Sequence, residues 1–582
     1  MILNREALYD HLLDNSNLSE CQIRNETTFE GISYEYVVNG KLSTSNGIFS
    51  IVIGIPRQWR IRLVDVYIVE PELPFIPHLE SNGKICLFDL EASVIDWDLF
   101  GILNQCIERA KDIIELGIQN ANSNDFIDEF DSYIGNIKNK KMLKVVLPNE
   151  KKTQKIKFCP TSNPSKVQRK NEKHADYKKR TEVLTFFAST RASDFDKWGY
   201  GREKKKNALY FYSSPDEAIL PPNYSLPITK EYLNRIFKSG SIRDCKYNPN
   251  MNSSLIVFGI NQPNGIVNVF AVILENCEFN IVNDEIELKS VKQIIPLICE
   301  RLDTEYLLGR TSESKNVLSN KNFLLVGCGS IGSYVFQNLI KSGVNKITLV
   351  DHDKLKAENI YRHLLGIESI KHGYKAEALR IYGKNMLPDL NINTLDDRIE
   401  ELVEDGSIEL SEYDYIIAAT GDAILNRWIN YYIHENNIKT PVFYLWNEPL
   451  DIGSHVGFFD LNLESCYGCL FARDENGELF DKSAYTEKGQ KIVKSNLGCQ
   501  GSYIPYGSLI SVQTSLLFIN VLKEVATGRL MDNALYSQKG DKYYFEQAGL
   551  KVSDVYQSQN EIIKITYGRD LVNKCCDICG GK

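Results

Sequence analysis

The hydrophobic and polar positions of this chain predict different architectures at its two ends. In residues 47–54 and 61–69, apolar side chains alternate with polar or small ones, as in paired strands with one buried face. A polar helix is expected before them, and an amphipathic helix after them from Leu99 to about Leu116. Near the other end, the apolar runs 322–326 and 346–350 predict buried strands separated by a helix, and a long apolar helix is expected from about Ser508 to Val525. The pattern favours an α+β region first and an α/β region last.

The middle of the chain carries weaker signals. Residues 137–180 are rich in lysine and poor in apolar side chains, which favours a solvated connector or edge over a surface for polynucleotides or acidic partners. Residues 181–300 contain strand-like runs at 255–259 and 266–274 but no motif with a defined chemistry. We therefore expect three domains, at residues 1–135, 136–300 (an α/β linker domain) and 301–582.

Composition narrows the class of protein. A chain of 582 residues is too long for one core, and about 150 residues per domain suggests three or four units. Its 43% hydrophobic and 25% charged content is ordinary for a soluble protein, and no apolar stretch approaches the ~20 residues of a membrane helix. The N-terminus lacks the order of a secretory signal, so a cytoplasmic location is expected. A net charge of −9 makes nucleic acid an unexpected partner, and 14 cysteines are too dilute for a disulfide scaffold.

A glycine-rich turn follows the first of the two C-terminal strands. Gly327, Gly329 and Gly332 permit a tight turn, close approach of backbone N–H groups to phosphate, and close packing of a helix on its strand. Asp351, directly after the second strand, is placed to bind ribose hydroxyls. The combination predicts a nucleotide site and, taken alone, would suggest NAD.

The polar residues that follow favour a triphosphate over a dinucleotide. Asn359, Arg362 and Lys375 stand at spacings that a dehydrogenase does not need, and an acidic residue, Asp422, comes later. Cationic side chains suit the phosphates, and a carboxylate suits the accompanying metal.

This series resembles the adenylating domain of the ubiquitin-activating, ThiF and MoeB superfamily over about residues 300–582. Asn359 and Arg362 match the family's Asn-x-x-Arg, and Lys375 falls thirteen residues after the arginine. The resemblance implies a Rossmann-type fold that binds ATP and Mg²⁺. In it, Asp351 would hold ribose, Asn359, Arg362 and Lys375 would hold phosphates, and Asp422 would hold magnesium.

One position differs from the family pattern, and the family also implies a partner subunit. Ala423 stands where the family usually has asparagine, while Arg427, five residues after the aspartate, fits the pattern. The family implies a homodimer through this domain, in which the partner can supply an arginine to the phosphates. Arg310 and Arg301, upstream of the glycine turn, are candidates for that residue.

Cys86 follows a proline-rich loop, His78 and an Asn-Gly turn, and precedes a tryptophan and the amphipathic helix. A single cysteine after a strand is usually a small buried residue, but this order of features resembles the ubiquitin-conjugating fold over about residues 1–135, in which the cysteine carries a thioester. The family's His-Pro-Asn is replaced by His78-Leu-Glu, two residues closer to the cysteine, so the asparagine that would stabilise the oxyanion is absent from its usual place. Asn82 or a backbone N–H could substitute, and His78 could equally be a structural hydrogen-bonding residue.

Two Cys-x-x-Cys pairs, Cys466 with Cys469 and Cys576 with Cys579, offer four thiolates for a tetrahedral ion. The adenylating family has pairs at these two places, which implies a structural zinc. A redox pair is the alternative, and Cys575 could belong to either site or to none.

Cys499 lies between glycines, ahead of the long apolar helix. Family members often carry a reactive cysteine at the end of the loop that crosses the nucleotide pocket, so the resemblance implies that Cys499 is the activating thioester site. The alternative is a packing cysteine near the helix start. Cys328, within the glycine turn, is expected to fill space inside the fold.

A conjugating-like domain followed by an activating-like domain resembles the bacterial ubiquitin-transferase-like proteins of CBASS antiphage systems. The family implies adenylation of a C-terminal glycine, capture on Cys499, transfer to Cys86 and conjugation to lysine, with a CD-NTase as the activated protein. One alternative is a ThiF- or MoeB-like activator of a sulfur carrier or ubiquitin-like protein without conjugation, which does not need the first cysteine domain. Another is a non-catalytic adaptor that binds a ubiquitin-like partner.

Overall fold

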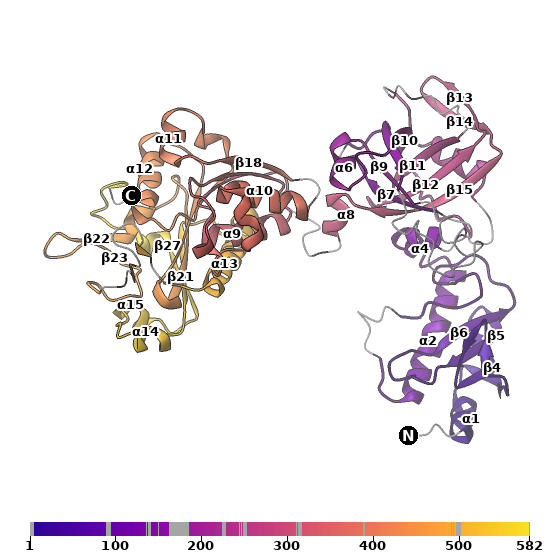
Figure 1. The fold of residues 1–582 in the computed structure, drawn as a ribbon. Helices are drawn as coiled ribbons and strands as arrows, with labels where there is room; N and C mark the ends of the chain where they lie inside the picture. The colour runs from indigo at the N-terminus through magenta and orange to yellow at the C-terminus, as the bar shows by residue number, and fades with distance from the viewer. Residues whose placement is uncertain are drawn as a thin grey trace, which may run out of the picture. The chain divides into compact units, whose positions relative to one another are not determined.

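The structure is a computed structural model that divides into two compact units, Met1–Leu302 and Asp303–Lys582 (Figure 1). The first unit contains a four-stranded sheet and a closed barrel, and the second contains an eight-stranded sheet. The described residues are those other than 1–4, 89–94, 136, 138–140, 149, 162–184, 224–227, 244, 246, 248–252, 310, 312–316, 388–389, 491, 493, 496–501, 504 and 581–582.

The first unit begins with an antiparallel sheet of order β1-β4-β5-β6. Helices α1 and α2 pack on its core through Leu8, Leu12 and Leu103, which are buried. The first predicted strand is confirmed, whereas the second begins only at β6, because the backbone N–H of Ile61 donates to Gln58 in a turn and cannot pair with the sheet. The elements are α1 (Arg5–Asp14), β1 (Leu18–Ile23), β2 (Thr28–Phe29), β3 (Ile32–Ser33), β4 (Tyr36–Thr44), β5 (Gly47–Ile55), β6 (Asp65–Glu70) and α2 (Leu99–Ile118).

A closed barrel of order β10-β11-β12-β15-β7-β9-β8 forms the rest of the first unit. Its interior is filled with apolar side chains, including Leu143, Val257 and Leu297. The elements are β7 (Lys141–Val146), β8 (Gln154–Pro160), β9 (Thr185–Ser189), α6 (Ala192–Lys197), β10 (Lys206–Ser213), α7 (Lys230–Phe237), β11 (Ser253–Asn261), β12 (Val267–Glu275), β13 (Glu278–Val282), β14 (Glu285–Ser290) and β15 (Gln293–Arg301).

The lysine-rich stretch 137–180 is not simply a solvated connector, because β7 and β8 of the barrel lie within it. On β8, Lys155 and Lys157 are exposed while Ile156 and Phe158 are buried. Charged side chains thus occupy the outward positions of a strand whose side chains alternate between the two faces. The expectation was wrong for this part of the stretch, and residues 162–184 lie outside the described residues.

Two short helices connect the sheet to the barrel. Phe130 packs on Phe270 of the barrel with ring centroids 6.1 Å apart, and Asn268 donates a 2.8 Å hydrogen bond from Nδ2 to the carbonyl of Ile127. All four residues are buried, so this segment is fixed to the barrel. The two helices are α3 (Asp125–Asp128) and α4 (Phe130–Gly135).

The second unit is built on a sheet of order β18-β17-β16-β19-β20-β21-β26-β27. Strands β18 to β20 are parallel, and β21, β26 and β27 are antiparallel to their neighbours. Because β16 pairs with β17 on one side and β19 on the other, the strand order reverses there and the loops after β16 and β19 border a crevice. The predicted strands 322–326 and 346–350 are confirmed as β16 and β17.

The second unit contains the following helices and strands. They are α8 (Thr304–Gly309), β16 (Asn322–Val326), α9 (Ser330–Lys341), β17 (Lys346–Val350), η1 (Ala357–Asn359), η2 (Ile367–His372), α10 (Lys375–Met386), β18 (Asn391–Leu395), α11 (Ile399–Glu404), η3 (Leu410–Glu412), β19 (Tyr415–Ala418), α12 (Ala423–Glu435), β20 (Val442–Asn447), η4 (Pro449–Asp451), β21 (Gly453–Phe459), η5 (Tyr467–Leu470), β22 (Phe471–Arg473), β23 (Leu479–Asp481), β24 (Lys494–Ser495), β25 (Ser502–Tyr503), α13 (Ser508–Ala526), β26 (Ala534–Lys539), α14 (Tyr543–Gln547), α15 (Asp554–Ser558), β27 (Ile563–Tyr567) and α16 (Gly568–Leu571).

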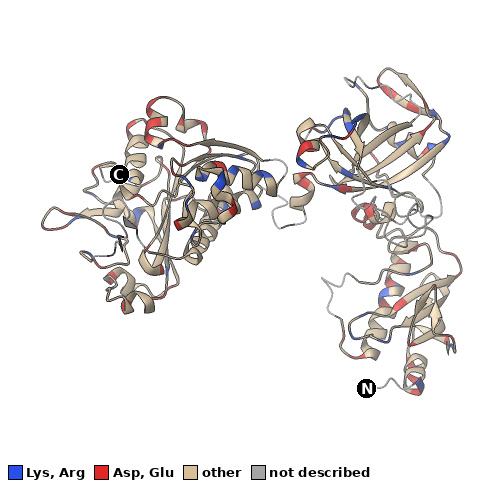
Figure 2. Cartoon of the chain, in the orientation of Figure 1, with Lys and Arg blue, Asp and Glu red and all other residues tan. Residues whose placement is uncertain are grey.

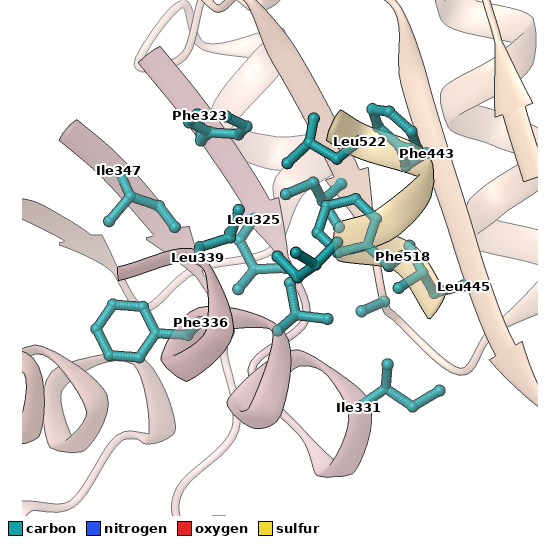
Figure 3. Packing of buried hydrophobic residues seen from close by; sticks show 14 of the residues in the cluster. Phe323, Leu325, Ile331, Phe336, Leu339, Ile347, Phe443, Leu445, Phe518 and Leu522 are labelled. Carbon is teal, nitrogen blue, oxygen red and sulfur yellow. The ribbon is translucent and has the colours of Figure 1, made fainter. Parts of the chain in front are cut away.

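Helices α9 and α13 pack side by side on this sheet, as Figure 3 shows. Phe336 and Leu339 of α9 share a buried cluster with Phe518 of α13 and Phe443 of β20, and the last two rings are 5.1 Å apart. Contrary to the expectation that no apolar stretch approaches the length of a membrane helix, α13 is long and apolar enough to cross a membrane, alone among helices of the described residues, and half of its most apolar window is buried. Its packing against α9 explains the apolar composition as that of a core helix.

Charged residues of both signs are interspersed on both units in Figure 2. Several form ion pairs, such as Lys41 with Glu20 at 2.7 Å and Lys321 with Asp414 at 2.9 Å. These side chains are at least a third exposed, so each pair contributes little to stability.

Candidate active sites

A cavity of about 650 Å³ lies at the crevice of the eight-stranded sheet, where the loops after β16, β17 and β19 meet. It brings together most of the polar residues that the sequence analysis selected for a nucleotide. These are Asp351, Asn359, Arg362, Lys375 and Asp422, together with Gly327 and Gly329.

The three glycines of the turn have different roles. Gly327 has φ +91°, and a Cβ there would lie 2.5 Å from the carbonyl of Ala419, so the turn needs glycine. A Cβ on Gly332 would lie 1.9 Å from the carbonyl of Gly327, which makes this residue essential for packing α9 on its strand. Gly329 caps α9 and would direct a Cβ into open space. A phosphate would fit that space, since the helix N-terminus favours an anion.

Asp351 is fixed by the turn that it faces. Its Oδ2 accepts a 2.7 Å hydrogen bond from the backbone N–H of Cys328, and its Oδ1 accepts one of 2.8 Å from Asp353. Each carboxylate oxygen has a second lone pair, which is available to a ribose hydroxyl. Cys328 itself is buried, as expected.

His363 is a cavity residue that the sequence analysis missed. It is 4% exposed, its Nε2 donates 2.9 Å to the carbonyl of Cys328, and its Nδ1 accepts from the backbone N–H of Leu365. Burial lowers the pKa of His363 to about 4, so the ring is neutral at pH 7. Through the bond to Cys328, His363 supports the glycine turn. The sequence gave no signal of this role, because a single histidine outside any motif is not distinctive.

Lys375 opens α10 and is nearly buried at 8% exposure. Its Nζ lies 2.7 Å from Oδ2 of Asp353, another residue that the sequence analysis did not assign. Burial alone would raise the pKa of Asp353, but the hydrogen bond and charge of Lys375 lower it. The ammonium is thus held at the cavity by a carboxylate, and a phosphate oxygen could share it.

Arg362 and Asn359 border the same cavity from the loop after β17. The guanidinium of Arg362 lies 5.7 Å from the ring centroid of Tyr506, and its carbonyl accepts a 2.6 Å hydrogen bond from the hydroxyl of Ser330, the first residue of α9. Asn359 Oδ1 accepts from the backbone N–H of Lys356, so its amide nitrogen can donate to a ligand.

Asp422 is the N-cap of α12. Its Oδ1 accepts from the backbone N–H groups of Ile424 at 2.8 Å and Leu425 at 3.2 Å, and the residue is exposed at the cavity wall. A cation could bind through the second oxygen while the first caps the helix. Arg427, one turn further along α12, instead places its guanidinium 5.5 Å from the ring centroid of Phe471.

Four cysteines of the second unit form a compact cluster. The sulfurs of Cys466, Cys469, Cys576 and Cys579 all lie within 4.8 Å of one another, with Cys466 and Cys576 3.7 Å apart. Tetrahedral zinc with Zn–S bonds of about 2.3 Å needs sulfurs separated by roughly 3.8 Å, so the four thiols fit this ion. Cys575 is exposed and outside the cluster.

Cys86 is exposed at the edge of the four-stranded sheet, and its backbone N–H donates 2.8 Å to the carbonyl of His78. The ring of His78 lies between two carboxylates, with Nε2 3.0 Å from Asp125 and Nδ1 3.3 Å from Glu129. The hydrogen bond to Glu129, and then the charge of both acids, raise the pKa of His78 against the effect of burial. With both nitrogens paired, His78 attaches the loop to α3 and to Glu129, which follows it.

The residues of the Asn-Gly turn before Cys86 also have a structural role. Asn82 Oδ1 accepts a 3.1 Å hydrogen bond from the backbone N–H of Lys84, and Gly83 has φ +80°. A Cβ on Gly83 would lie 2.2 Å from the carbonyl of Ile68, so only glycine allows the turn to pair with β6.

Cys499 and Arg310 lie outside the described residues. The other arginine considered for a partner's phosphates, Arg301, belongs to the barrel, where its Nη1 donates 3.0 Å to the carbonyl of Val267.

Comparison with known proteins assigns both cysteine-bearing units. Residues 21–143, which include Cys86, match the family described as Prokaryotic E2 family B. Residues 305–547, which include the cavity, match the ThiF family. The chain is a fusion of an E2-like domain and a ThiF domain.

Similar proteins are found among bacteria. The E2–ThiF chain is 31% identical over 229 residues to the ATP-dependent ubiquitin transferase-like protein Cap2 of Pseudomonas aeruginosa, an alignment that covers 39% of this chain and 40% of the relative. It is 28% identical over 225 residues to the Cap2 protein of Escherichia coli, covering 37% of each. The matched part therefore spans less than half of these relatives.

A search of solved structures finds Escherichia coli MccB with ATP. It shares 18% identity with this chain at a TM-score of 0.33, covering 46% of this chain and 68% of MccB.

Proposed function

We propose that this E2–ThiF chain activates the C-terminal glycine carboxylate of a protein with ATP and conjugates it to a lysine. The carboxylate attacks the α-phosphorus of ATP and displaces pyrophosphate. The Cys499 thiolate then takes the acyl group and releases AMP. Cys86 receives the group by thioester exchange and passes it to an amine.

The observation that carries this proposal is the grouping of opposite charges around the N-terminus of α9. Lys375 and Arg362 are cationic, and both line the cavity that Gly329 leaves open. They would offset the charge of the departing pyrophosphate, while Asp351 would hold ribose. Magnesium, held by Asp422, would neutralise phosphate charge when bound.

The partners and cofactors complete the proposal. The activated protein is a CD-NTase, as the similarity to CBASS-type transferases implies, and the reaction takes place in the cytoplasm. The ThiF domain forms a homodimer, and the four-cysteine cluster holds a structural zinc. The exposed position of Cys86 supports the relay over an activator of sulfur carriers, because such an activator has no need of an E2-like domain.

Pyrophosphate exchange tests the adenylation step. Asp422→Asn keeps an oxygen that can cap α12 but removes the charge, so we expect exchange driven by a glycine-tailed CD-NTase to fall by about 100-fold or more. Asp405→Asn is the matched control, since Asp405 is an exposed aspartate of the same domain whose side chain bonds only to Ser407 among the described residues. Unchanged exchange in Asp422→Asn would remove the metal assignment.

A further inference from the structure

A buried tyrosine hydroxyl and Cys86 are bonded to the same residue. The backbone N–H of His78 donates 2.9 Å to the hydroxyl of Tyr133, and its carbonyl accepts from the backbone N–H of Cys86. The hydroxyl from α4 is therefore separated from the cysteine backbone by a single residue. No motif in the sequence marks Tyr133.

Other polar side chains of this region have prior partners. The ring of His78 is shared between Asp125 and Glu129, and Asn82 Oδ1 closes its own turn. Within the described residues, the hydroxyl of Tyr133 accepts from His78 and makes no hydrogen bond as a donor. The hydroxyl proton therefore has no acceptor among the described residues.

The surroundings of Tyr133 keep this hydroxyl protonated and in place. Burial raises the pKa of Tyr133 against the hydrogen bond from the His78 backbone, which lowers it, and the charges of Glu129, Asp125 and Cys86 raise it further. The ring packs on Phe126 at 5.2 Å and on Phe75 at 5.6 Å. Since α4 is fixed to the barrel, the hydroxyl has a rigid support.

We propose that the Tyr133 hydroxyl donates the hydrogen bond that stabilises the oxyanion formed on a Cys86 thioester, in place of the asparagine that this domain lacks. The inference rests on the proposed conjugation reaction and adds a residue to it. By binding α3 and α4, the barrel becomes a structural part of the thioester site.

Aminolysis of the Cys86 thioester proceeds by addition to the carbonyl and loss of the thiolate. The amine nitrogen bonds to the thioester carbon, and the C=O electron pair moves onto oxygen, where the Tyr133 O–H stabilises it. Collapse restores C=O and breaks the C–S bond, so that Cys86 leaves as a thiolate. The proton of the amine is lost to water.

Loading Cys86 chemically, and then following loss of the acyl group, tests this role without using the adenylating activity of the ThiF domain. The full chain is charged by exchange with a synthetic peptide thioester ending in glycine, and aminolysis by free lysine is followed by mass spectrometry of the Cys86 peptide. We expect Tyr133→Phe to slow aminolysis by about 100-fold. Aminolysis at the wild-type rate would overturn the proposal. Because ATP plays no part, a failure of adenylation leaves this result intact.

A matched control separates a lost hydroxyl from a lost fold. Tyr34 is also 5% exposed, and its hydroxyl bonds to Asp65 and Tyr67 within the same domain. Tyr34→Phe should discharge at the wild-type rate. An equal slowing in both variants would show a general effect of hydroxyl loss and contradict the proposal.

Changing the donor strength of the Tyr133 hydroxyl distinguishes a role in the reaction from a purely structural role. Replacing Tyr133 with 3-fluorotyrosine leaves the ring packing nearly unchanged but makes the phenol a stronger donor. We expect aminolysis at pH 7 to become faster than in the wild type. An unchanged rate would mean that the hydroxyl only anchors His78, and the proposed donor role would be wrong.

Discussion

At the scale of single residues, the polar groups of the cavity are of two kinds: those placed to bind a ligand, and those that orient these ligand-binding side chains. Asp351 has both carboxylate oxygens on backbone N–H groups, and Lys375 is held by Asp353. Such bonds orient a side chain before a ligand arrives, which lowers the entropic cost of binding. The holding residues come from different loops, so they follow no spacing along the chain.

His363 predicts a pH dependence of stability at this scale. Its folded pKa of about 4 is below the unfolded value of 6.5, so protonation favours the unfolded state. Its contribution is complete above about pH 6.5 and is lost as the pH falls toward 4. That gap, at 1.36 kcal/mol per pH unit, corresponds to about 3 kcal/mol.

We therefore expect wild-type stability to fall relative to His363→Gln as the pH is lowered from 7 to 4.5, because glutamine does not titrate. Melting temperatures of the two full-length proteins at matched pH values measure this difference. Parallel curves for the two proteins would contradict the assignment of a neutral buried ring.

Asp422 predicts separate effects on stability and activity. Asp422→Ala removes both the cap of α12 and the charge, and should cost about 1 kcal/mol in addition to activity. Asp422→Asn should lose activity alone. Thermal unfolding of the two variants beside the wild type checks this, and equal melting temperatures for Asp422→Ala and wild type would show that the cap is dispensable.

At the scale of elements, the sequence predicted the pieces whose chemistry is local. The strands β16 and β17 and the glycine turn were found because their residues are adjacent in the chain. The strand β8 was missed because its outward lysines dominate the composition, although the inward Ile156 and Phe158 alternate with them. Tyr133 was missed because its partner, His78, lies in a distant segment.

The glycine turn predicts opposite consequences for two similar substitutions. Gly329→Ala places a methyl group in open space, so the ThiF domain should fold normally and lose ATP affinity. Gly332→Ala places one 1.9 Å from a carbonyl and should lower the melting temperature instead. Thermal unfolding with and without ATP measures both. A stable Gly329→Ala variant with wild-type ATP affinity would contradict the phosphate site.

The cysteine cluster predicts one zinc per chain and offers its own control. Cys576→Ser should lose the metal and lower the melting temperature, because one of the four ligands is gone. Cys575→Ser, one residue earlier and exposed, should keep both. Elemental analysis of the purified variants reports the zinc content, and a wild-type protein that lacks zinc would refute the assignment.

At the scale of the whole molecule, one chain carries two candidate sites with different chemistry. The ThiF domain has a cavity suited to ATP, and the E2-like domain has an exposed cysteine in a loop that the barrel supports. Two thiols on one polypeptide raise the effective concentration of each for the other. The motifs predicted this plan from the sequence, while the barrel's part in the Cys86 site required the structure.

The central claim is tested most directly by peptide mass spectrometry of the acyl group on the two cysteines. Wild-type chain with ATP, magnesium and a glycine-tailed CD-NTase should carry an ATP-dependent thioester on Cys86. Cys86→Ala should retain a thioester on Cys499, and Cys499→Ala should carry none on either residue. A Cys86 thioester that forms without ATP or without Cys499, or none in the wild type, would contradict the relay.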